Sequence, residues 1–189
     1  MLNYSINSDI RQKIIFFLAI LSAGTGTLLG VLISDLSFKI SIPSAFAIFG
    51  IYFWVFDNFL WKIPLIKSIH RIPNLNGKWT GNIKRSVDGQ VYIDLPIKAE
   101  IQQTWSKIQI EVIGTQTRSL VISLSMELSS DSRKFIDYIY EVKPTLEGDT
   151  ENRRGEGCQN LILENNDLLS GRFFSSKLRK GTLILNRNK

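Results

Sequence analysis

Two long apolar segments stand near the start of the chain, separated by only six residues. The first, residues 14–33, contains no charged residue, and the second, residues 40–61, contains only Asp57. A helix rises about 1.5 Å per residue, so about 20 residues cover the roughly 30 Å hydrocarbon core of a bilayer. A surface helix of a soluble protein would carry a polar face, and a cleaved signal peptide would have a shorter apolar core. We therefore predict a two-helix transmembrane hairpin in residues 1–71.

Basic residues flank this hairpin on the side where the two segments begin and end. They are Arg11, Lys13, Lys62, Lys67 and Arg71. The loop between the segments has only Lys39 against Asp35. The positive-inside rule then predicts an inner-membrane protein with both termini in the cytoplasm. Cys158 is the only cysteine, which excludes an internal disulfide and agrees with a reducing compartment.

Small residues recur at every fourth position of the first apolar segment. They are Ser22, Gly26, Gly30 and Ser34. Such a stripe lets two helix backbones approach closely. It would pack either the two helices of one molecule or helices of different molecules, and the sequence leaves both open.

From about residue 72 onward, apolar and polar residues alternate, as in strands with one buried face. Residues 93–101 and 120–128 are examples, and the second predicts a row of apolar side chains from Leu120 to Leu128 that includes Ile122. Eight strands are expected near 77–86, 90–103, 105–115, 118–128, 134–143, 157–164, 168–175 and 180–187. Eight antiparallel strands with short turns predict an up-and-down, lipocalin-like barrel over residues 72–189, with a two-sheet sandwich as the alternative. The interior of such a barrel is either filled or holds one small ligand.

Signals of catalysis are scarce in the sequence. His70 is the only histidine and lies beside Arg71, where an interfacial role is expected. No phosphate loop, dinucleotide fingerprint or nucleophile elbow is present, and one cysteine and one histidine do not make a zinc site without carboxylates. We expect no enzyme activity, catalytic residue, metal or cofactor. The net charge of +6 arises entirely after residue 61, which suits an anionic ligand or anionic lipid headgroups.

Ligand binding is easier to support, because period-two counting carries several polar side chains to the inner face. The candidates are Trp79, Arg85, Gln103, Tyr138, Tyr140 and Gln159 on strands, with Arg153 and Arg154 in a loop at one mouth. Arginine offers paired donors to phosphate, Tyr and Trp stack on bases, and Gln reads base edges.

The strand opening Gly77-Lys78-Trp79 resembles that of lipocalins and fatty-acid-binding proteins, in which the Trp closes one end of the barrel. The two apolar segments, the basic connector and the eight strands together resemble the membrane effectors of CBASS anti-phage systems. That resemblance implies a cytoplasmic barrel that binds a cyclic di- or trinucleotide made by a nucleotidyltransferase on infection. It further implies oligomerisation, inner-membrane disruption and cell death, with no DNA or RNA partner.

Two other functions remain open from the sequence. A membrane-anchored, lipocalin-like carrier would have a mainly aliphatic cavity for an apolar ligand, and the aliphatic rows of the second and fourth strands fit it. A structural membrane protein would have a filled barrel. The side chains that line the interior discriminate among the three.

Overall fold

The chain divides into two compact units. The computed structural model describes residues 1–34, 44–87, 91–128, 134–145 and 154–188. One unit joins Met1–Asn7 to Ile72–Lys189, and the other is Ser8–Arg71. The division after Arg71 coincides with the expected boundary. The first seven residues group with the strands, whereas the sequence led us to expect them in the membrane region.

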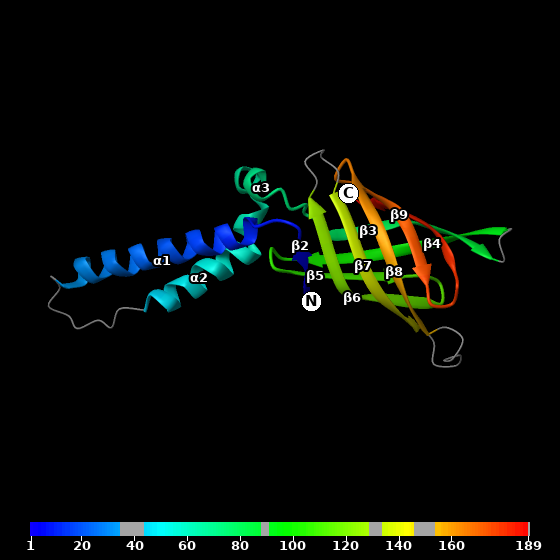
Figure 1. Ribbon diagram of the computed structural model, residues 1–189, viewed down its shortest axis with the longest axis horizontal. Helices are drawn as coiled ribbons and strands as arrows, with labels where there is room; N and C mark the ends of the chain where they lie inside the picture. Colours follow the sequence, from blue (N-terminus) through cyan, green and yellow to red (C-terminus); the bar gives the residue numbers. More distant parts are fainter. Residues whose placement is uncertain (35–43, 88–90, 129–133, 146–153, 189) are drawn as a thin grey trace. The chain divides into compact units, whose positions relative to one another are not determined.

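Eight long strands form the larger unit (Figure 1). They are β3 (Gly77–Val87), β4 (Val91–Gln103), β5 (Lys107–Ile113), β6 (Thr117–Leu128), β7 (Lys134–Pro144), β8 (Gly155–Glu164), β9 (Leu168–Ser175) and β10 (Lys180–Arg187). Each pairs antiparallel with the next, and β10 pairs with β3 to close the sheet. The predicted eight-stranded antiparallel barrel is confirmed, and the two-sheet alternative is excluded because the strands form one closed sheet.

One stretch of the inward and outward pattern differs from the prediction. The register of β6 against β7 shifts between Val121 and Ser123. Such a bulge inserts an extra residue and reverses which side chains face inward on either side of it. Val121 is buried and Ile122 is 52% exposed, so the apolar row expected from Leu120 to Leu128 is wrong on the N-terminal side of the bulge.

The first residues of the chain complete the wall of the barrel where β5 and β6 part. These two strands pair directly only between Glu111–Ile113 and Arg118–Leu120. Beyond that, β1 (Leu2–Asn3) pairs antiparallel with β5, and β2 (Ser5–Ile6) pairs parallel with β6. Tyr4, between them, is 2% exposed and its hydroxyl donates to the carbonyl oxygen of Trp105 at 2.8 Å.

The interior of the barrel is packed at one end only. Apolar side chains from all eight strands fill that end, among them Trp79, Ile101, Ile108, Met126, Ile136, Leu161, Leu169 and Leu185. Toward the other ends of the same strands, polar and charged side chains such as Arg85 and Tyr140 join apolar ones such as Leu95 and Leu183 at the inward positions. The structure therefore has a filled floor and an open mouth.

The smaller unit contains α1 (Ile10–Ser34), α2 (Ala45–Asn58), the short 3₁₀ helix η1 (Leu60–Lys62) and α3 (Pro64–His70). Ile10–Ile33 is apolar and long enough to cross a bilayer, and only 11% of its most apolar window is buried. The segment Ala45–Lys62 passes the same test only together with α3, from which it bends by 99°. The helix α2 begins at Ala45 rather than at the expected residue 40, and residues 35–43 lie outside the described residues.

The helices α1 and α2 contact each other through part of the small-residue stripe. Ser22 is 3% exposed, and a Cβ added to Gly26 would meet Ala45 and Ile48 of α2 at ordinary contact distances. The hydroxyls of Thr25 and Tyr52 lie 3.0 Å apart across the same contact. These contacts lie within one molecule, which is one of the two arrangements that the sequence left open.

The buried hydroxyl of Tyr4 generates a stability prediction. Tyr4→Phe leaves the Trp105 carbonyl oxygen and the Gln103 amide that also donates to Tyr4 without this partner. We expect the free energy of unfolding of the barrel to fall by about 1–3 kcal/mol, the cost of buried polar groups left unsatisfied. Thermal unfolding of the full-length protein in detergent measures it. Asn3→Ala, at an exposed position of β1, is the control, and equal midpoints for the two variants would contradict the role of Tyr4.

Candidate functional site

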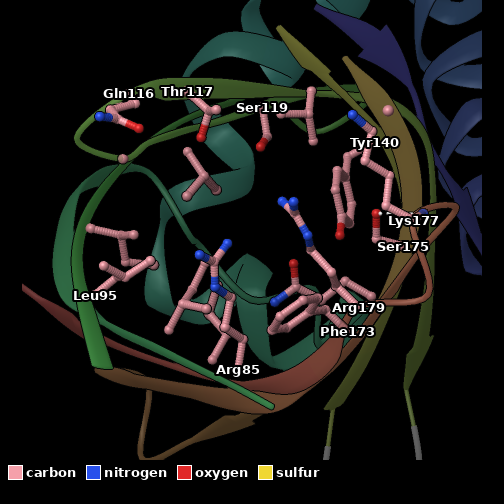
Figure 2. Close-up of a pocket in the computed structure, with 18 of the residues that line it drawn as sticks. Arg85, Leu95, Gln116, Thr117, Ser119, Tyr140, Phe173, Ser175, Lys177 and Arg179 are labelled. Atoms are coloured by element: carbon pink, nitrogen blue, oxygen red, sulfur yellow. Dashed lines mark hydrogen bonds between the residues drawn. The ribbon is translucent and has the colours of Figure 1, made fainter. Parts of the chain in front are cut away.

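A cavity of about 550 Å³ occupies the open half of the barrel (Figure 2). All eight long strands or their turns contribute to its wall, and its floor is the apolar packing described above. Figure 2 shows Gln116, Thr117 and Ser119 on one side of the cavity and Tyr140, Ser175 and Lys177 on the other. The volume lies within the usual range for sites that hold a small organic ligand.

Four cationic side chains border this cavity. Arg85 comes from β3, Arg154 precedes β8, and Lys177 and Arg179 come from the turn between β9 and β10. Arg154 and Arg179 are exposed at the mouth, whereas Arg85 is half-buried. The Nε atom of Arg85 is buried and has no hydrogen-bond partner within the described part of the chain. A buried donor without a partner is costly, so the site is suited to a ligand that supplies an acceptor.

The wall opposite Arg85 carries two tyrosines and a glutamine. The hydroxyl of Tyr138 donates to Oε1 of Gln159, and the rings of Tyr138 and Tyr140 meet edge to face with centroids 6.1 Å apart. Gln159 is 6% exposed, and its Nε2 has no partner among the residues that the structure describes. Because the Tyr138 hydroxyl engages the amide oxygen, the amide nitrogen is the donor left for a ligand.

Gly157 makes room for this arrangement on β8. A Cβ at this position would overlap the phenol of Tyr140 and the carbonyl oxygen of Phe174. Only glycine therefore allows the Tyr140 ring to lie against β8. The width of the cavity on this side depends on that contact.

The structure brings together five of the eight side chains that the sequence singled out for ligand contact. Arg85, Tyr138, Tyr140, Arg154 and Gln159 all line the cavity. Arg153 lies outside the described residues. Trp79 and Gln103 face inward as expected but lie in the closed end and do not line the cavity, because counting by twos gives the face of a strand and not the depth along it.

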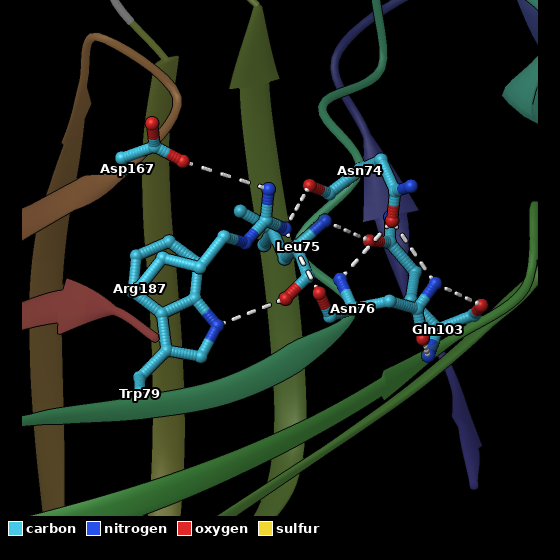
Figure 3. A network of polar contacts seen from close by, with 7 residues as sticks. All are labelled: Asn74, Leu75, Asn76, Trp79, Gln103, Asp167 and Arg187. Carbon is cyan, nitrogen blue, oxygen red and sulfur yellow. Dashed lines mark hydrogen bonds and ion pairs between the residues drawn. The ribbon is translucent and has the colours of Figure 1, made fainter. Parts of the chain in front are cut away.

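Gln103 instead hydrogen-bonds to two segments of the chain. One precedes α1, and the other follows α3. Its Oε1 accepts from the backbone N–H of Leu75 at 2.8 Å, and its Nε2 donates to the carbonyl oxygen of Pro73 and to the Tyr4 hydroxyl. Asn76 adds two hydrogen bonds to the Gln103 backbone (Figure 3). Gln103 is 3% exposed, and its role is structural.

Trp79 closes the same end of the barrel. Its indole N–H donates to the carbonyl oxygen of Leu75 at 3.0 Å, and the guanidinium of Arg187 lies 4.9 Å from its ring centre. Arg187 also donates to the carbonyl oxygens of Asn74 and Asn76 (Figure 3). Trp79 and Arg187 thus hold the segment that follows α3 against the barrel floor.

Several residues that line the cavity were missed from the sequence. Thr117 and Ser119 precede the bulge in β6, where period-two counting from Leu124 assigns the wrong face. Lys177 and Arg179 lie in a turn, which has no strand periodicity. The only signal for the turn was its basic composition, since Lys180 follows directly.

The cavity therefore combines cations at its mouth, unpaired donors at its depth and aromatic rings on one wall. Among the described residues, no group of histidine, cysteine and carboxylate side chains is placed to hold a metal ion. The donors favour an anionic ligand rich in acceptors, and the flat aromatic surfaces of Tyr140 and Phe173 favour planar rings.

The two buried phenols generate a prediction about pH. Burial raises the pKa of Tyr140 to about 12, with a smaller contribution from Cys158. Burial also raises the pKa of Tyr138 well above its usual value, and Tyr140 adds to the shift. An unfolded tyrosine ionises near pH 10, so the folded state holds its protons where the unfolded state loses them. We expect the free energy of unfolding to fall as the pH rises above 10.

Tyr138→Phe should make this fall less steep, because one of the two protons no longer contributes. Thermal unfolding between pH 8 and about pH 11.5, with phenolate absorbance recorded in parallel, measures both effects. If all five tyrosines ionise together near pH 10 in the folded protein, the phenols are not buried as described.

Comparison with known protein families agrees with this geometry. Residues 70–187 match the family model described as Cap15, cyclic dinucleotide receptor domain. No curated protein matches the chain at a significant level. The match covers the connector and all eight long strands, including the whole cavity, but not β1 and β2. The chain therefore belongs to the Cap15 cyclic dinucleotide receptor family of CBASS effectors.

Proposed function

We propose that the cavity in the open half of the barrel is the cyclic dinucleotide site of this receptor. In this proposal, ligand binding there leads to oligomerisation and to disruption of the inner membrane by residues 8–71. The observation that carries the proposal is the pair of unpartnered donors, Arg85 Nε and Gln159 Nε2, in a cavity that three further cations border. The family description narrows the expected cyclic di- or trinucleotide to a dinucleotide.

The cations match the two phosphates of such a ligand. Arg85 is half-buried on β3, whereas Arg154 and Arg179 are exposed at the mouth. One phosphate would sit against Arg85, and the other would lie among the cations of the mouth. Arginine donates to phosphate through paired N–H groups. Each phosphate can therefore replace the hydrogen bonds to water that these groups lose when the ligand binds.

The aromatic wall matches the bases. The Tyr140 and Phe173 side chains line the cavity from β7 and β9, the two strands that flank β8, and stacking of a base on an aromatic ring contributes about 1–3 kcal/mol. The free Nε2 of Gln159 would donate to an acceptor on a base edge or on the ring of phosphates. Because Tyr138 orients the amide, this donor is fixed in direction before the ligand arrives.

A carrier of an apolar ligand fits the site less well. Such a ligand would remove water from Arg85 and Gln159 without offering an acceptor, and that loss costs several kcal/mol. Apolar side chains such as Leu95, Val112 and Leu183 also line the open half, but they do not offset the cost of burying these two donors without acceptors. The polar and charged side chains in the lining of the open end favour a nucleotide over an apolar ligand.

The membrane part of the proposal rests on the two helices and on the position of the first residues. Met1–Asn7 and Ile72–Lys189 form one compact unit, so the segment between them starts and ends on the same side of a membrane. It must then cross an even number of times, and α1 with α2 supplies two crossings. The exposed Phe16, Phe17, Phe46 and Trp54 would face lipid, and the flanking basic residues support a cytoplasmic position for the barrel.

Binding of cyclic dinucleotides to the full-length protein in detergent tests the site. We expect Arg85→Ala to weaken binding by about ten- to hundredfold, the range for a lost hydrogen bond to a charged group. Lys84→Ala is the matched control, because Lys84 is the exposed neighbour of Arg85 on β3. Isothermal titration with a set of synthetic cyclic dinucleotides gives the dissociation constants. A screen in which fatty acids bind and none of these nucleotides does would favour the carrier instead.

A second prediction concerns the hairpin. Gly26 faces α2, whereas no atom lies within 4 Å of the Cβ position of Gly24. Gly26→Leu should separate α1 from α2 and reduce membrane damage, and Gly24→Leu should not. Dye entry into cells that express the protein with an activating nucleotidyltransferase measures the damage, and nucleotide binding should be unchanged in both variants. Equal damage by the two inserted variants would show that the α1–α2 contact is not needed.

A further inference from the structure

An exposed apolar row crosses the outer surface of the barrel over β6–β9. Ile139 on β7 pairs with Cys158 on β8, and Cys158 pairs with Phe174 on β9. Ile122, in the bulge of β6, follows on the other side of Ile139. The exposed fractions are 52% for Ile122, 47% for Ile139 and 53% for Phe174, and Cys158 is also exposed. We call these four residues the outer row.

Single exposed apolar residues are ordinary on protein surfaces, but a contiguous set marks an interaction site. Cross-strand partners in a sheet lie about 5 Å apart, so the side chains of the outer row touch or nearly touch one another. The alternating pattern of a half-buried strand would place polar residues at these positions. Their apolar character therefore needs another surface to cover it.

Charged residues beside the outer row divide into an acidic and a basic half. In the adjacent row, Asp137 on β7 is paired through Asn160 on β8 with Arg172 on β9. On the same side as Arg172, Lys180 of β10 follows Phe174. The Arg172 side chain is exposed. Asp137 and Arg172 thus lie on opposite sides of β8. A second copy turned about β8 would bring the acid of one copy opposite the base of the other.

We propose that the outer row is the contact between two copies of this chain, related by a two-fold axis that runs along β8. Such an axis sets Cys158 beside Cys158 of the second copy and Ile139 opposite Phe174. It also sets Asp137 opposite Arg172, twice in each dimer. This is an isologous interface with an apolar centre and a charged rim.

The outer row lies on the reverse side of the strands that line the cavity. Tyr138 and Tyr140 flank Ile139 on β7, Gln159 follows Cys158 on β8, and Phe173 precedes Phe174 on β9. A ligand that shifts these inner side chains therefore shifts the outer row as well. This step rests on the proposed cyclic dinucleotide site, whereas the contact itself does not.

A bilayer surface is the other occupant that an apolar row could have. Anionic headgroups attract basic patches, but Asp137 and Glu156 lie exposed next to the outer row. Their charge opposes approach to an anionic membrane. Asp137 is complementary to Arg172 of a second copy, so the second copy is favoured.

The single cysteine provides a direct test, since the chain has no other thiol. Membranes from cells that express the full-length protein are treated with a short bismaleimide, with and without the set of cyclic dinucleotides. We expect a cross-linked product of twice the chain mass, and none with Cys158→Ser. Absence of this product in every condition overturns the proposal. Protection of Cys158 from a water-soluble maleimide in a protein that stays monomeric overturns it too, because the row would then face lipid.

Charge reversal distinguishes this interface from chance collisions. Asp137→Arg or Arg172→Asp places like charges opposite each other and should lower the cross-linked fraction about tenfold, since like-charge contacts cost more than one kcal/mol. The double variant Asp137→Arg/Arg172→Asp should restore it. Asp94→Arg, at an exposed site on β4, is the matched control and should cross-link normally.

Rescue by the double variant supports the two-fold contact, and failure of rescue overturns it. Titration of the same samples with the cyclic dinucleotides keeps the two proposals apart. A receptor that cross-links but binds none of them loses the proposed ligand site and keeps the interface. A receptor that binds them and cross-links equally in all variants loses the interface alone.

Discussion

Closure of the barrel by its own first residues is the constraint on which the other features depend. The strands β5 and β6 pair over only a few residues, and beyond them the wall consists of Leu2–Ile6. An open edge there would leave backbone groups unpaired and the apolar floor in contact with water. Tyr4 secures the segment through Trp105 and Gln103. The residues just before α1 and just after α3 therefore both belong to the barrel unit.

The floor and the mouth of the barrel differ in how their buried polar side chains are hydrogen-bonded. At the floor, Gln103, Asn76 and Arg187 hydrogen-bond to the connector, and the surrounding side chains are apolar and buried. At the mouth, Arg85 and Gln159 keep buried donors without partners. Natural proteins tolerate such unsatisfied groups where they bind or react. Arg187 Nε, at the floor, also has no partner among the described residues, so the proposed site at the mouth is supported by the cations and polar side chains that line the cavity together with these donors.

The sequence predicted most of the fold, because alternation and turn residues are local signals. All eight long strands were found within a few residues, and the interior direction of Arg85, Tyr138 and Gln159 agrees with their positions on the cavity wall. It did not predict that Gln103 lies at the floor, since depth depends on the register between strands. The bulge near Ile122 was also invisible, because an extra residue leaves the composition of the strand unchanged. The pairing of residues 1–7 with β5 and β6 joins segments a hundred residues apart and has no local signal.

In the proposed function, strands β7, β8 and β9 would transmit ligand binding inside the barrel to the outer row. A ligand shifts an equilibrium only by binding one state better than another. Gln159 Nε2 has no partner among the described residues, so under the proposed function a ligand that accepts from it would favour whichever position of β8 completes that bond. Because side chains alternate along a strand, that position also sets Cys158 on the outside, and with it the outer row. In a barrel wall one residue thick, the proposed recognition inside and the proposed contact outside would therefore depend on the position of the same backbone.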